Sequence, residues 1–101
     1  MMVDLIMMGD VMRYCRLTLG QVEVIKEGAV KFGFEYARFG FGHNILVRDP
    51  WDKTGETNIR VGHIEDLTSL PPFLEIYGFN DLPKKIQAGV KLILEACGLN
   101  E

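Results

Sequence analysis

The sequence predicts an α+β fold in which a short N-terminal helix and a C-terminal pair of helices pack on an antiparallel meander of about four strands. Side-chain polarity alternates through residues 29–49, which is typical of strands with one buried face, because successive Cβ atoms point to opposite sides of a sheet. After residue 67 the apolar residues recur at helical spacing instead. A chain of 101 residues fits a single domain, so we expect one core over residues 1–101.

The N-terminal segment has a helical pattern of apolar residues. They recur at three- and four-residue spacing, namely Leu5, Met8, Met12 and Cys15. Asp4 can cap the first turn of such a helix, whereas Gly9 weakens it by about 1 kcal/mol relative to alanine. The pattern predicts a helix over residues 5–16.

Residues 21–36 fit two interpretations. A helical stripe is present, with Thr18 as a cap; it consists of Val22, Ile25, Ala29, Phe32 and Tyr36. Against a helix stand Gly28, Gly33 and several β-branched residues, whose propensity penalties sum to about 3 kcal/mol. The alternation and a glycine-containing turn at residues 26–28 favour a hairpin of two strands instead.

A second hairpin is predicted from residues 44–48 and 58–64, which both alternate and are separated by the turn residues of 49–56. Folding the chain about Lys53 matches the apolar residues across the strands, which is how register is normally set. The resulting pairs are Val47 with Ile59, Ile45 with Val61, and His43 with His63.

The last third of the chain predicts two helices. The first covers residues 70–78 and follows Ser69, and the second covers residues 81–97 and ends at Gly98. The second helix has an apolar stripe, made of Ile86, Val90, Ile93, Leu94 and Cys97. We expect this stripe to pack on the aromatic face of the sheet.

The two histidines suggest a metal or small-ligand site. In the predicted register His43 and His63 are cross-strand neighbours, and Glu65 shares the parity of His63. Imidazole and carboxylate groups are ligands of transition metals such as zinc. Against a metal, the sequence has no closely spaced pair of histidines and no cysteine cluster, and both rings could instead find backbone partners.

Two Phe-Gly-Phe repeats, at residues 32–34 and 39–41, suggest single-stranded nucleic-acid binding as a second alternative, because exposed sheet aromatics stack on bases. The net charge of −3 and the scattered basic residues disfavour it, since binding to phosphates needs clustered lysine and arginine. The rings fit a protein core equally well.

Aromatic residues in two segments indicate a protein-interaction surface. Trp51 lies in the long turn, and Phe73, Tyr77 and Phe79 belong to a segment with more apolar area than a short helix buries in so small a domain. Our preferred hypothesis is therefore a small interaction module that forms a homodimer and has no catalytic activity of its own.

No nucleophile or phosphate-loop motif occurs, and Ser69, the only serine, fits a helix cap. Cys15 and Cys97 are not part of a Cys-x-x-Cys pair, which favours reduced thiols and a cytoplasmic protein. The apolar run at residues 5–8 is too short to span a bilayer, so we expect no membrane contact.

Overall fold

The computed structural model describes residues 3–40, 42–48, 53–54, 58–66 and 71–99, and within them the fold is α+β, as predicted. The elements along the chain are β1 (Asp4–Met8), β2 (Val11–Cys15), α1 (Leu19–Lys31), β3 (Glu35–Phe39), β4 (Gly42–Arg48), β5 (Asn58–Glu65), β6 (Phe73–Tyr77), the 3₁₀ helix η1 (Phe79–Asp81) and α2 (Lys84–Ala96).

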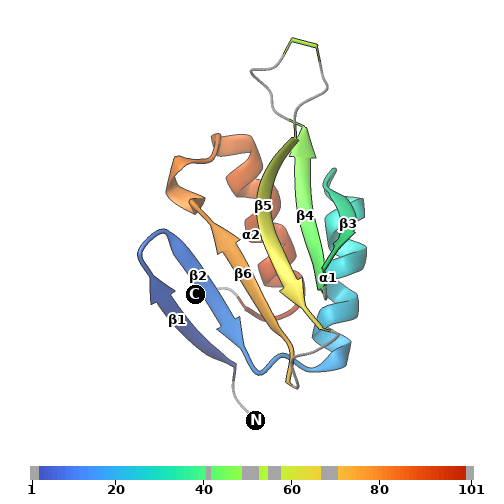
Figure 1. Cartoon of the computed structure of the whole chain (residues 1–101), viewed down its shortest axis with the longest axis vertical. Coiled ribbons are helices and arrows are strands. Elements are labelled where there is room, and N and C mark those ends of the chain that lie inside the picture. Colours follow the sequence, from blue (N-terminus) through green and yellow to red (C-terminus); the bar gives the residue numbers. More distant parts are fainter. Residues whose placement is uncertain (1–2, 41, 49–52, 55–57, 67–70, 100–101) are drawn as a thin grey trace.

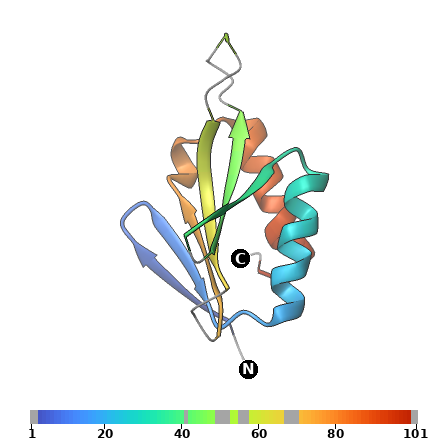
Figure 2. The same ribbon diagram turned by 45° about the vertical axis from the view of Figure 1, so that its right-hand side comes forward.

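All six described strands form one sheet in the order β1-β2-β6-β5-β4-β3, and every neighbouring pair is antiparallel (Figure 1). The chain leaves β2 through α1, reaches the far edge at β3 and returns strand by strand until β6 pairs with β2. Both helices lie on the same side of the sheet (Figure 2). The other side is called the open face below.

The predicted N-terminal helix is wrong, because residues 4–15 form the β1–β2 hairpin. Met8 pairs with Val11 across a two-residue loop, and Gly9, at the first loop position, has a φ of 60°. That conformation suits a type II′ turn, which joins antiparallel strands tightly. The segment therefore forms strands because β2 pairs with β6, although the spacing of its apolar residues also fits a helix.

The predicted hairpin over residues 21–36 is also wrong, because residues 19–31 form α1. Thr18 and Gln21 make a capping box: the Gln21 amide donates to Thr18 Oγ1 at 3.0 Å, and the Thr18 amide donates to Gln21 Oε1 at 2.9 Å. One side of the helix is buried against α2 and the sheet, which offsets its poor propensity; its residues are Val22, Ile25, Gly28 and Ala29.

The helix predicted over residues 70–78 is wrong as well, because Phe73–Tyr77 form the strand β6. Leu74 and Ile76 point to the helices and are 0% and 3% exposed. The C-terminal helical pair thus reduces to α2 preceded by the short η1. The predicted stripe of α2 is confirmed, since all five of its residues are buried.

The β4–β5 hairpin is confirmed, but only part of its register is. Val47 lies opposite Ile59 as predicted. A register shift between Ile45 and Leu46 then moves the remaining pairs by one residue, so that Ile45 faces Gly62 and His43 faces Ile64. The predicted pairs Ile45–Val61 and His43–His63 are therefore wrong.

The core lies between the sheet and the two helices. Its largest fully buried side chains come from α1, β4, β5 and β6: Ile25, Ile45, Val61, Ile64 and Leu74. Neither helix of the described part of the chain has the length and apolar composition that a bilayer crossing requires.

Candidate functional site

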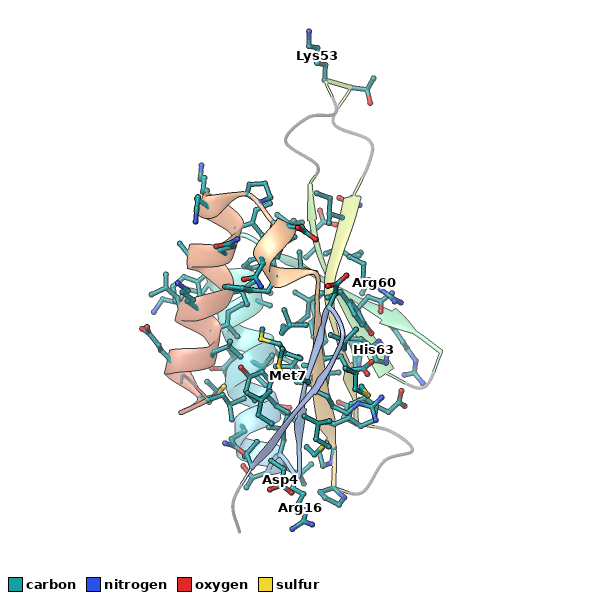
Figure 3. All side chains as sticks on the ribbon, turned by 90° about the vertical axis from the view of Figure 1, so that its left-hand side faces the viewer. Asp4, Met7, Arg16, Lys53, Arg60 and His63 are labelled. Carbon is teal, nitrogen blue, oxygen red and sulfur yellow. The ribbon has the colours of Figure 1, made fainter. Side chains whose placement is uncertain are left out.

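The open face carries a row of side chains that crosses the whole sheet. Residues that lie directly opposite one another on neighbouring strands point to the same face. The row consists of Ile6, Arg13, Glu75, His63, Asn44 and Ala37, one from each strand. Figure 3 shows His63 of this row, and nearby Arg60, on the side of the sheet away from the helices.

Arg13, Glu75 and Tyr77 form a hydrogen-bonded network in the middle of this face. Arg13 donates through Nε and Nη2 to Glu75 Oε2 at 3.0 and 2.7 Å, and the Tyr77 hydroxyl donates to Glu75 Oε1 at 2.9 Å. Burial alone would raise the pKa of Glu75, but the hydrogen bonds from Arg13 and Tyr77 and the charge of Arg13 lower it. Burial and the bond to Glu75 raise the pKa of Tyr77 to about 12.

Two arginines lie over aromatic rings of β6. The Arg13 guanidinium is 4.4 Å from the centre of the Phe73 ring, and that of Arg60 is 4.5 Å from the centre of the Tyr77 ring. Val11 of β2 lies opposite Tyr77 and therefore adds apolar surface beside this ring. The arrangement combines fixed aromatic rings, fixed cations and apolar neighbours.

His63 has both ring nitrogens engaged. Its Nδ1 lies 2.9 Å from Asn44 Oδ1, and its Nε2 lies 3.0 Å from Glu65 Oε1. The ring packs over Gly42, where a Cβ atom would come within 2.8 Å of Nε2. A metal or substrate would therefore have to displace Asn44 or Glu65 to reach a nitrogen lone pair.

His43 points to the other face of the sheet, toward α1. Its ring stacks on Tyr36 at 4.6 Å between centres, and its Nε2 lies 3.7 Å from Asp66 Oδ1. Lys26 of α1 holds the other oxygen of Asp66 at 3.1 Å. Burial lowers the pKa of His43, against the opposing effect of Asp66, and burial also raises the pKa of Tyr36.

The structure therefore does not bring the predicted metal ligands together. His63 and Glu65 are in contact, but His43 lies on the opposite face, because its strand partner is Ile64. Among the described residues no group of three or more histidine, cysteine, aspartate or glutamate side chains is placed to hold a metal ion. The register shift between Ile45 and Leu46 is the physical reason that His43 and His63 are not cross-strand neighbours.

The predicted interface residues have separate positions. Phe73 and Tyr77 belong to the open face, through the register that pairs them with Glu65 and Val11. Phe79 lies in η1 and packs against the core, and Trp51 lies outside the described residues.

The two Phe-Gly-Phe repeats lie in different parts of the fold. Phe39 belongs to β3, and Phe41 lies outside the described residues. Phe34 is 5% exposed in the core, and Phe32 caps the C-terminus of α1, so neither lies on a strand. The sequence reasoning missed Arg13, Arg60 and Glu75. For Glu75 the signal was the alternation of residues 73–77, which places phenylalanine, glutamate and tyrosine on one face of a strand.

Comparisons with models of protein families, with curated proteins and with solved structures found no match.

Proposed function

We propose that this protein is an interaction module that self-associates and uses the open face of its sheet to dock a protein, without catalytic activity of its own. One observation carries the proposal. Both helices cover the same side of the sheet (Figure 2), so no described helix or strand covers the other side, where Arg13 and Arg60 lie over the rings of Phe73 and Tyr77. Tyrosine and arginine are among the residue types that contribute most to binding at interfaces.

The open face is ordered before any partner binds. Glu75 holds Arg13 and Tyr77 through hydrogen bonds, and the stacking on Tyr77 restrains Arg60. Binding therefore loses less side-chain entropy than it would on a surface of free arginines. The charge of Arg13 is already paired with Glu75, which reduces the cost of burying it in an interface.

Both cysteines are free thiols, which supports action in the reducing cytoplasm.

Light scattering coupled to size-exclusion chromatography tests the self-association. We expect the measured mass to rise from that of one chain to that of two as the concentration increases from about 1 µM to about 500 µM. A mass of one chain over this whole range would contradict the proposal.

Docking to the open face is tested by comparing partners recovered from the protein's own cells. The Tyr77→Ser and Arg60→Ser variants should each lose partners that the unmodified chain and a Leu92→Ser control retain. Leu92 is a suitable control because it is an exposed apolar residue, 45% exposed, on α2. Equal recovery by all four proteins would exclude the open face as the docking surface.

A further inference from the structure

We propose that two copies of this chain join through their β1 strands into one continuous antiparallel sheet, with Ile6 at the two-fold axis. The inference rests on the self-association proposed above and assigns it to a particular surface. β1 is an edge strand with a neighbour, β2, on one side only (Figure 1). Its outer edge faces the viewer in Figure 3, with no other described element in front of it.

From Leu5 to Met8 the β1 edge lacks the features that normally protect an edge strand, and its one charged residue, Asp4, lies at the start of the strand. Natural sheets block edge pairing with charged side chains, proline or a bulge. β1 reads Asp-Leu-Ile-Met-Met, and its register with β2 contains no bulge. Three consecutive apolar residues are exposed: Ile6 by 45%, Met7 by 60% and Met8 by 43%. The opposite edge, β3, carries exposed Glu35 and Arg38, so it is protected.

The backbone of β1 offers free hydrogen-bonding groups at alternate residues. The two-residue loop makes Met8 and Val11 a hydrogen-bonded pair, and the pattern then alternates along the hairpin. Ile6 therefore bonds to β2, whereas Leu5 and Met7 direct their N–H and C=O groups outward. These are the groups that a second strand needs.

One register between the two β1 strands pairs every residue of both strands. With the two-fold axis at Ile6, all five residues of each β1 strand face a residue of the other. Leu5 of one copy then forms hydrogen-bonded pairs with Met7 of the other on the helix side, and the two Ile6 side chains meet on the open face. A register shifted by one residue would place the outward N–H and C=O groups of one β1 strand opposite residues of the other copy whose N–H and C=O groups point toward their own β2 strand.

Charge is compatible with this register. Asp4, the only charged residue of β1, lies opposite Met8 of the other copy rather than opposite a second Asp4. Each Asp4 also lies 3.3 Å from Arg16 of its own chain, which offsets its charge at the two ends of the interface. No like charges are therefore brought together.

The size of the contact indicates a weak, closed dimer. A pair of five-residue strands buries less surface than the roughly 1,600 Å² of a standard stable interface, so we expect a dissociation constant in the micromolar range. The protected β3 edge prevents addition of further copies, so association ends at two chains. The open faces of the two copies then lie side by side on one sheet, and the row that ends at Ile6 continues into the second copy.

Two variants and a matched control test the surface by light scattering. Ile6→Lys places a charge at the axis, and Met7→Pro removes an outward N–H without removing a bond to β2. Leu92→Lys is the control, because Leu92 and Ile6 are both 45% exposed. We expect the unmodified chain and Leu92→Lys to form the dimer, and Ile6→Lys and Met7→Pro to lose it while keeping the unmodified circular dichroism spectrum.

Three outcomes are distinguishable. If Ile6→Lys and Met7→Pro fold and remain dimeric, the β1 interface is overturned, while the self-association stands. If the unmodified chain is monomeric throughout, the self-association and the β1 interface both fail. Loss of the dimer in the two β1 variants alone supports both.

Cysteine cross-linking tests the register and does not depend on the lysine or proline variants folding. In a Cys15→Ser background, Ile6→Cys should form an intermolecular disulfide on mild oxidation, because non-hydrogen-bonded pairs bring their Cβ atoms within about 5 Å. Met8→Cys, which faces Asp4 of the other copy, should cross-link at least tenfold more slowly. Equal cross-linking of the two variants, or none, overturns the register.

Discussion

Asn44, rather than His43, is the partner of His63 across the β4–β5 hairpin, and its amide oxygen lies 2.9 Å from the imidazole Nδ1. Asn44 is only 8% exposed, although both described helices lie on the other side of the sheet. The pair is possible because Gly42, two residues before Asn44, leaves room for the His63 ring. A glycine on one strand therefore determines how a histidine on the next is held.

This packing makes Gly42→Ala destabilising. The added Cβ would lie 2.8 Å from His63 Nε2 and still closer to the carbonyl oxygen of Ile64, a backbone atom that can move only with its strand. We expect a loss of about 1–3 kcal/mol in the free energy of unfolding, measured by urea denaturation. Gly20→Ala is the control, since its Cβ meets only Thr18 Oγ1 at 3.7 Å. Equal stability of the two variants would contradict the geometry.

The β4–β5 region shows how far the sequence leads. Both strands and the pair Val47–Ile59 follow from alternation and a long polar turn. The bulge does not follow, because Val61 and Gly62 are both compatible with the buried face, so the alternation hides the extra residue. The close approach of β6 requires glycine at position 62, because a Cβ there would lie 2.6 Å from the Glu75 carbonyl oxygen. Glu75 is distant in the sequence, so local alternation does not indicate this contact. The mistaken histidine pairing came from this one-residue shift.

The helix α1 shows a second limit of prediction from the sequence. Glycines and β-branched residues made a hairpin locally preferable, and packing of the buried face against α2 reversed that preference. The capping box of Thr18 and Gln21 was the local signal that could have identified the helix. For β6, the prediction of a helix over residues 70–78 neglected the alternation of residues 73–77.

Two helical glycines should respond to alanine in opposite ways. Each substitution gains about 1 kcal/mol of helix propensity. At Gly28 the new Cβ meets Ile93 Cγ1 at 3.5 Å, an ordinary contact, so Gly28→Ala should stabilise the protein by up to about 1 kcal/mol. At Gly89 the Cβ would lie 2.9 and 3.0 Å from the buried Phe34 ring, so Gly89→Ala should be destabilising by about 1–3 kcal/mol.

Urea denaturation of both variants against the unmodified chain measures the difference. The decisive quantity is the sign of each change, because propensity alone predicts that both are stabilising. A stabilising Gly89→Ala would mean that the Phe34 ring can move away from Gly89 at little cost.

His43 should make stability depend on pH in a defined range. Burial lowers its pKa in the folded protein below the ordinary 6.5, so at pH values just below 6.5 the unfolded chain binds a proton that the folded chain does not. The contribution of neutral His43 to the free energy of unfolding is therefore fully present above pH 6.5. It is lost as the pH falls through the pKa that His43 has in the folded protein. Urea denaturation between about pH 7.5 and pH 5 should show the free energy of unfolding decreasing with acidification.

His43→Gln tests the origin of this dependence, because glutamine keeps a polar side chain of similar length but does not titrate. The variant should show a shallower decrease than the unmodified chain over the same range. A variant with an equally steep decrease would assign the effect to other groups. A rise in the stability of the unmodified chain on acidification would mean that Asp66, 3.7 Å from the ring, outweighs burial and that a protonated His43 is favoured in the fold.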